Sequence, residues 1–267
     1  GWQNSATAEA GTNGEPRPSE GGNKATLTIS GGKLTGGQIT VKNDDYGVLK
    51  ITGGEITQTN DSRYAVYNAN ETTISGGTIK ATGTSGVAVG TEKFNENANK
   101  GDLTISGGVF ESKGNVIQGS GGAEITITKG DFSTTSSNNG YIVYLASDST
   151  AVISGGTYGG ISGIDKVVNI ENSFAENYAP KEDNNGNIIV DYKDELAEAI
   201  VTDVDGNTKN YLTLSSAMSA APAGSTVTLM KNVELTKNAK TVNYGVTVDL
   251  NGFNIDGSSV KSSDGVI

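Results

Sequence analysis

The sequence lacks several residue types on which common protein chemistries depend. It has no cysteine, so disulfide bonds and thiolate metal sites are excluded. It also has no histidine, the residue that most often acts as a general base or activates a serine nucleophile. Only two arginines, Arg17 and Arg63, are present, and the formal net charge is −11. Because phosphate binding needs clustered cations, this charge argues against a nucleic-acid partner.

Long apolar runs are missing as well. No stretch approaches the ~18 consecutive apolar residues of a membrane-spanning helix, so we expect no membrane insertion. The chain begins without a signal peptide, and we interpret Gly1-Trp2 as a processing boundary. Any signal or wall anchor is then expected to lie outside this fragment.

Glycine, in contrast, is abundant: 38 of 267 residues, about twice the usual share of ~7%. Much of it lies in one recurring phrase. "LTISGGKL" begins at Leu27, and "LKITGGEI", "TTISGGTI", "LTISGGVF", "ITITKGDF" and "AVISGGTY" follow. The central isoleucines are 22, 23, 31, 22 and 26 residues apart, spacings typical of solenoid proteins. These isoleucines are Ile29, Ile51, Ile74, Ile105, Ile127 and Ile153.

Each copy contains the pattern of several short strands. Leu27 and Ile29 alternate with Thr28 and Ser30, as in a strand with one buried face. A glycine pair, a second apolar residue and a third apolar stretch such as "YAVYNA" or "YIVYLA" follow. A unit of about 22 residues with this order is one coil of a parallel β-helix, and the crossover rule favours a right-handed coil. We predict one internal column of the isoleucines and a second column of Leu34, Ile56, Ile79, Phe110, Phe132 and Tyr158.

The glycine pairs predict a corner in each coil. The second glycine is present in all six copies, so we expect it to need a positive φ or to have no room for a Cβ atom. The first is replaced once, by Lys129, so we expect that position to tolerate a side chain. A leucine-rich repeat has a similar period, but isoleucine and threonine dominate here, as β-strands prefer.

The regular pattern changes at several places. Residues 90–101 hold a polar insertion that we expect to be a surface loop. "VVNIENSF" is interpreted as a degenerate seventh copy that keeps Val168, Ile170 and Phe174. Asn185-Gly186 is a hairpin turn signal, and the strands beside it are expected to cover the open end of the stack.

A second solenoid is predicted from about residue 199. A hairpin around Asp205-Gly206 precedes a helix at residues 213–221, with Thr213 as its N-cap. Two strands one coil apart follow. The predicted organisation is an irregular segment or partial coil at residues 1–24, a β-helix with a capping hairpin at 25–198, and the capping helix and first coils of a truncated second β-helix at 199–267.

Two segments carry a family resemblance. The first half resembles the right-handed β-helix repeats of large Gram-positive bacterial surface proteins, which use "ISGGT" coils and end in a segment like "FAENYAP...NGNIIV". The second half, in "YLTLSSAMSAAPAGSTVTLMKNVEL", resembles the N-terminal cap of pectin-lyase-like β-helices. The resemblance implies an extracellular protein, secreted or attached to the cell wall. It is specific for the fold and not for an activity, because that superfamily includes lyases, hydrolases and adhesins.

The residues that this superfamily uses for catalysis are not recognisable. Its lyases use an Arg or Lys base with Asp-bound Ca²⁺, and its hydrolases use an Asp cluster with a nearby His. Asp44-Asp45 is interpreted as a turn, and "DVDGN" at Asp203 as a hairpin turn rather than a calcium loop. We therefore expect no catalytic residue, metal site or cofactor. The alternative is a fragment of a polysaccharide lyase or glycoside hydrolase whose active coils lie elsewhere or whose carboxylates come from different coils.

Binding by aromatic residues remains. Tyr64, Tyr67, Tyr141 and Tyr144 lie on the same strand of different coils, and alternation does not decide which of each pair faces outward. An exposed row would stack on sugar rings; the alternative is that one tyrosine of each pair belongs to the core. We expect a non-enzymatic, adhesin-like or spacer module whose partners are host or cell-wall glycans or proteins. An open strand edge in residues 245–267 predicts self-association.

Overall fold

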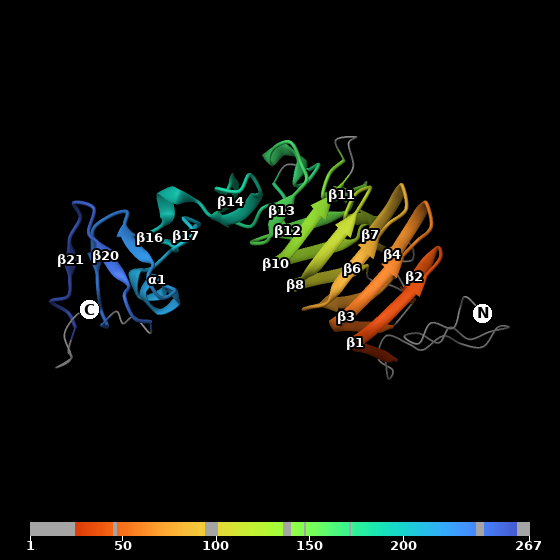
Figure 1. The fold of residues 1–267 in the computed structure, drawn as a ribbon, viewed down its shortest axis with the longest axis horizontal. Coiled ribbons are helices and arrows are strands. Elements are labelled where there is room, and N and C mark those ends of the chain that lie inside the picture. The colour runs from red at the N-terminus through yellow and green to blue at the C-terminus, as the bar shows by residue number, and fades with distance from the viewer. Residues whose placement is uncertain are drawn as a thin grey trace. The chain divides into compact units, whose positions relative to one another are not determined.

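The computed structural model describes residues 25–44, 47–93, 101–135, 140–146, 148–170, 172–238 and 243–260. The protein is all-β, with 54% strand and 6% helix, and its parallel strands form about 9 turns of a β-solenoid (Figure 1). The predicted parallel β-helix is confirmed. By compactness the chain forms two units, residues 1–175 with 187–190 and residues 176–186 with 191–267. The domain boundaries expected after residues 24 and 198 stay a prediction.

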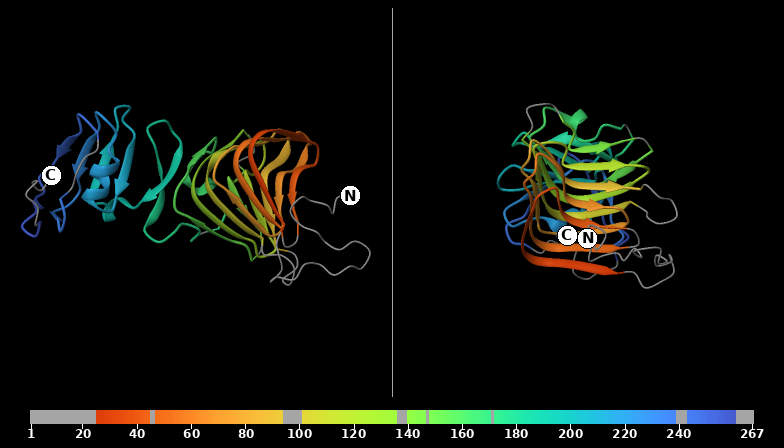
Figure 2. Two further views of the ribbon diagram at one scale, coloured as in Figure 1. Left: turned by 90° about the horizontal axis from the view of Figure 1, so that it is seen from below. Right: turned by 90° about the vertical axis from the view of Figure 1, so that its right-hand side faces the viewer.

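Two parallel sheets build the first unit, and Figure 2 shows their strands stacked coil upon coil. Equivalent residues of successive coils pair in register, for example Ile29 with Ile51 and Ile105 with Ile127. The first sheet contains β1 (Thr26–Gly36), β3 (Val48–Gln58), β5 (Glu71–Ile74), β6 (Thr78–Ala81), β8 (Asp102–Ser112), β10 (Glu124–Thr134), β12 (Thr150–Ile153) and β13 (Thr157–Gly159). The second contains, in spatial order, β2 (Ile39–Asn43), β4 (Ser62–Asn68), β7 (Ser85–Glu92), β9 (Ile117–Ser120) and β11 (Val143–Leu145).

The core of the first unit contains both predicted columns, with one exception: Leu34, expected in the second column, is 41% exposed because β1 is the end strand of the sheet and has a neighbouring strand, β3, on one side only. All six isoleucines of the repeat are buried, with side chains no more than 9% exposed. The second column ends in three stacked aromatic rings, with centroids 4.8 Å apart for Phe110 and Phe132 and 5.1 Å apart for Phe132 and Tyr158. The hydroxyl of Tyr158 donates a hydrogen bond of 2.8 Å to the carbonyl of Gly155, so this buried polar group is satisfied.

The glycine corners confirm one expectation and correct another. The second glycine of every pair has a positive φ, from 82° at Gly32 to 145° at Gly130, as predicted. The expectation that the first position tolerates a side chain is wrong for most copies. A Cβ atom at Gly53 would lie 2.5 Å from the carbonyl oxygen of Ser30 in the coil below. Lys129 occupies the equivalent position in its coil, where it pairs with Ser106, and its side chain is exposed.

The seventh copy was predicted in the wrong register. Val168 forms a bridge with Val143, so it continues the second sheet, and Phe174 rather than Ile170 forms the bridge with Ile153. Ile170 is 38% exposed. The reason is that Val167 and Val168 form the adjacent apolar pair that marks the second sheet, described below. After this coil, residues 188 and 189 pair antiparallel with β13 and cover the last strand edge of the first sheet.

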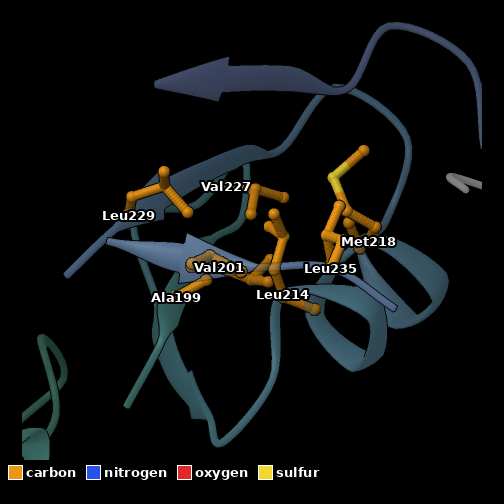
Figure 3. Packing of buried hydrophobic residues seen from close by; sticks show 10 residues of the cluster. Ala199, Val201, Leu214, Met218, Val227, Leu229 and Leu235 are labelled. Carbon is orange, nitrogen blue, oxygen red and sulfur yellow. The ribbon is translucent and has the colours of Figure 1, made fainter. Parts of the chain in front are cut away.

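The second unit contains the predicted helix. Residues Leu214–Ala220 form α1, and the hydroxyl of Thr213 caps it by accepting a hydrogen bond from the amide of Ser216. Leu214 and Met218 point from α1 into a small apolar core (Figure 3). The strands are β14 (Tyr178–Glu182), β15 (Ile188–Tyr192, shared with the first unit), β16 (Ala199–Thr202), β17 (Thr208–Tyr211), β18 (Thr226–Leu229), β19 (Val233–Glu234), β20 (Thr247–Asp249) and β21 (Ile255–Asp256).

Pairing in this unit begins antiparallel and becomes parallel. β16 pairs antiparallel with β17 and with β18, after which β18 pairs parallel with β20, and β19 parallel with β21. The parallel pairs are the first coils of the second solenoid, and α1 packs against β16, β17 and β18. Two short 3-10 helices, Ile164–Lys166 in the first unit and Asp194–Leu196 in the second, complete the elements.

Candidate functional site

The four tyrosines all lie on the outer side of the second sheet and are half-buried. Two adjacent residues between each pair, Ala65–Val66 and Ile142–Val143, both point into the core and are 0% exposed. The residues before and after them therefore both face outward. The alternative in which one tyrosine of each pair belongs to the core is wrong. The signal was in the sequence, because the adjacent apolar residues in "YAVY" and "YIVY" break simple alternation.

The two tyrosine pairs are connected by one column of the sheet, which contains Tyr67 and Tyr144. Tyr67 pairs in register with Gly90, Gly90 with Gln118, and Gln118 with Tyr144. The pairs are therefore three strand spacings apart, about 14 Å at ~4.8 Å per strand. Tyr64 lies three residues before Tyr67 in β4, and Tyr141 three residues before Tyr144, just ahead of β11. We call this surface the tyrosine strip, composed of Tyr64, Tyr67, Gly90, Gln118, Tyr141 and Tyr144.

Gly90 gives the ring of Tyr64 the space that it occupies. The rings of Tyr64 and Tyr67 have centroids 5.4 Å apart and planes tilted by 39°. A Cβ atom at residue 90 would lie 2.3 Å from two ring carbons of Tyr64, which no real side chain permits. The ring of Tyr64 therefore lies over the backbone of the neighbouring strand. Gly90 lies within β7, and the ring accounts for the glycine there.

A carboxylate stands beside this first pair. The hydroxyl of Tyr67 donates a hydrogen bond of 2.8 Å to Oε2 of Glu92. Burial, together with this bond and the charge of Glu92, raises the pKa of Tyr67 well above its ordinary value. Burial also raises the pKa of Tyr64. Both phenols therefore stay protonated at neutral pH. Lys42, which pairs with Tyr67 in the neighbouring strand, forms an ion pair of 2.7 Å with Asp44.

The second pair has a similar geometry. The ring centroids of Tyr141 and Tyr144 are 6.4 Å apart, and their planes are tilted by 40°. The ammonium of Lys166 lies 4.9 Å from the centroid of the Tyr141 ring, a cation–π contact. The amide of Tyr141 donates a hydrogen bond of 3.2 Å to the side-chain oxygen of Asn115, which holds the backbone beside the ring.

A buried amide ladder behind the strip was missed by sequence reasoning. Nδ2 of Asn43 donates to Oδ1 of Asn68, and Nδ2 of Asn68 donates to the hydroxyl of Thr91, both at 2.9 Å. All three side chains are at most 1% exposed. These residues follow Lys42, Tyr67 and Gly90 directly in sequence, so the ladder holds those columns in register. The repeated asparagine in "TVKN" and "AVYN" was its sequence signal.

The acidic motif at Asp203 forms a turn. Oδ1 of Asp203 accepts hydrogen bonds of 2.9 Å from the amides of Asp205 and Asn207. Hydrogen bonds from Asn207 lower the pKa of Asp203. The antiparallel strands β16 and β17 flank the loop, so the predicted hairpin turn is confirmed. In the other predicted hairpin turn, Asn185-Gly186, Gly186 has a φ of 78°. Asp45 and residues 94–100 of the insertion lie outside the described residues.

Other features were searched for within the described ranges. They contain no group of three or more His, Cys, Asp or Glu side chains that could hold a metal ion. None of their helices has the length and apolar character needed to cross a membrane. In the segment of predicted self-association, residues 261–267 lie outside the described part of the chain, and β20 has one parallel partner, β18. That self-association stays a prediction.

Comparison with known proteins gives no match. The chain matches no protein-family model, no curated protein and no solved structure.

Proposed function

We propose that this chain is a non-enzymatic module of a secreted or cell-wall-attached bacterial surface protein, and that it binds glycans through the tyrosine strip. The resemblance of its repeats to Gram-positive surface proteins and to pectin-lyase-like β-helices supports the location. The observation that carries the binding proposal is the placement of the Tyr64 ring over Gly90, beside Tyr67.

The chemistry of the strip suits a sugar. Sugar rings present C–H groups on their faces and hydroxyls at their edges, so they pack on an aromatic ring while bonding to polar groups beside it. Glu92 supplies an acceptor at the first pair, and the amide of Gln118 supplies both a donor and an acceptor between the pairs. The hydroxyl of Tyr67 is already held by Glu92, which orients the ring before a ligand arrives.

Affinity electrophoresis through gels containing different soluble polysaccharides tests this proposal. We expect at least one glycan to retard the wild-type protein strongly, and the double variant Tyr64→Ala/Tyr67→Ala, which keeps only the second pair, to be retarded much less. Tyr244→Ala is the matched control, because Tyr244 is 94% exposed and lies in the second unit. Equal retardation of the double variant and the wild type would remove the strip from the binding site.

The alternative, a polysaccharide-degrading enzyme, has a separate test. We expect no product release from polygalacturonate, with or without Ca²⁺, because histidine is absent and no arginine accompanies paired aspartates in the repeat strands. Product release by the purified chain that a single Asp substitution abolishes would establish the enzyme instead.

A further inference from the structure

We propose that the tyrosine strip binds one linear β-1,4-linked glucan-type chain across both tyrosine pairs at once, with the chain running along the stacking direction of the solenoid. This inference rests on the proposed glycan binding and adds the ligand's linkage, its orientation and its minimum length. Three observations support it: the shared column of Tyr67 and Tyr144, the matching ring tilts, and the groups between the pairs, which are the ring of Tyr64 over Gly90 and the amide of Gln118.

The shared columns set the direction of the ligand. Tyr67 and Tyr144 stand at opposite ends of one register column, with Gly90 and Gln118 between them. The column crosses the strands, so a ligand that touches both pairs must run from coil to coil. The distance of about 14 Å, from three strand spacings of ~4.8 Å, exceeds one sugar ring, so both pairs can be filled only by an oligomer.

The two pairs have matching geometry. Their ring planes are tilted by 39° and 40°, although the pairs lie on different coils. In both cases two adjacent inward residues, Ala65–Val66 and Ile142–Val143, separate the tyrosines and set their directions. A polymer with a regular repeat would therefore meet a similar surface at each end of the strip.

Between Tyr67 and Tyr144 the column contains the ring of Tyr64 over Gly90 and the amide side chain of Gln118. Gly90 contributes no side chain, and the ring of Tyr64 covers it. Gln118, the next residue in the column, carries an uncharged amide that can donate to and accept from hydroxyls. A chain that runs from one pair to the other therefore passes over the ring of Tyr64 and then beside the amide of Gln118.

These features favour an equatorially linked chain. In a β-1,4-linked glucan the linkages and ring hydroxyls are equatorial, so the chain is an extended ribbon with C–H faces and hydroxyl edges. An α-1,4-linked glucan curves, so its rings leave a straight column after the first contact. The ribbon matches a column with rings at both ends and the amide of Gln118 between them.

Binding to both pairs has a measurable consequence. Once one pair holds a chain, the second pair meets the same chain at a high effective concentration, provided that the chain is long enough. Affinity should therefore rise steeply with chain length up to the length that spans the strip and level off beyond it. Each pair alone should show the weak, length-independent affinity of a single site.

Isothermal titration calorimetry with cello-oligosaccharides, from the disaccharide to the hexasaccharide, tests the inference. For the wild type we expect the hexasaccharide to bind at least about tenfold more tightly than the disaccharide. Tyr67→Ala and Tyr144→Ala should each remove this increase and leave disaccharide affinity within about threefold of the wild type, while Tyr244→Ala keeps the full increase. Malto-oligosaccharides of the same lengths should show no increase. Circular dichroism establishes that each variant is folded.

Three results would overturn the inference. Equal affinity for all lengths would show that the pairs act separately, and a length dependence that survives Tyr144→Ala would place the second contact elsewhere. Failure of every cello-oligosaccharide to bind would exclude the ligand class. The proposed function is tested separately by the gels. It fails if no polysaccharide retards the wild-type protein more than the double variant Tyr64→Ala/Tyr67→Ala.

Discussion

Replacing Ile105 by alanine tests the stacked core directly. Ile105 is 0% exposed and pairs with Ile74 on one side and Ile127 on the other. The substitution removes three carbon atoms, which at ~0.8 kcal/mol each gives about 2.4 kcal/mol of lost burial. The cavity adds to this loss, so we expect the free energy of unfolding to fall by ~2–5 kcal/mol.

The measurement is urea unfolding followed by far-UV circular dichroism, which reports the strands throughout the protein. The matched control is Thr104→Ala, since Thr104 is the adjacent residue of β8 and is exposed. We expect the control to change the free energy of unfolding by less than ~0.5 kcal/mol. A loss under ~1 kcal/mol for Ile105→Ala, or equal losses for both variants, would place Ile105 outside the core and refute the coil register.

Three further predictions concern the corners, the aromatic column and the helix. Gly53→Ala should lower the free energy of unfolding by more than ~1 kcal/mol because the added Cβ atom meets the backbone of the coil below. Gly31→Ala should change it by less than ~0.5 kcal/mol because the space around Gly31 is open. Equal effects of the two variants in thermal melts would contradict the close stacking of the coils. Burial raises the pKa of Tyr158, so above about pH 10 the unfolded chain ionises first and the free energy of unfolding should fall as pH rises. Tyr158→Phe should reduce this fall, and it should cost ~1 kcal/mol at neutral pH because the hydrogen bond to Gly155 is lost. An alkaline stability profile that Tyr158→Phe leaves unchanged would argue against the burial of Tyr158. Thr213→Ala should lower the free energy of unfolding by ~1 kcal/mol because the N-cap of α1 is lost, whereas Thr213→Ser should keep most of the wild-type stability. Equal stability of Thr213→Ala and the wild type would contradict the cap.

The sequence predicted the architecture well because burial and backbone conformation repeat with the coil. Ile29 and its equivalents recur at one place in each coil, which identifies an inward column without any knowledge of neighbours. The second glycine of each pair has a positive φ that most side chains resist, so its presence in all copies was informative. The short helix was equally readable, because Thr213 marks its start and Leu214, Ala217 and Met218 form one apolar stripe.

The details that failed depend on contacts between coils. Lys129 suggested freedom at the first corner position, but the limit at Gly53 comes from the carbonyl of Ser30 in the coil below, which no local pattern reveals. Ile170 was assigned to the core because alternation was extended through "VVNIENSF", although the adjacent pair Val167–Val168 belongs to the second sheet.

The candidate site was predicted only in part. The residue types and their strand were readable, but the outward direction of both tyrosines depends on the two adjacent inward residues between them. The role of Gly90 depends on the ring of Tyr64, which comes from the neighbouring coil.

Tyrosine-selective isotope labelling followed by NMR titration with a retarding polysaccharide tests the central claim most directly. The chain contains 10 tyrosines, which include the buried Tyr158 and the exposed Tyr244 as internal references. We expect the ring resonances of Tyr64, Tyr67, Tyr141 and Tyr144 to shift with added glycan while Tyr158 and Tyr244 stay unchanged. Shifts confined to other tyrosines, or a saturating ligand that moves none of these four, would contradict glycan binding by the tyrosine strip.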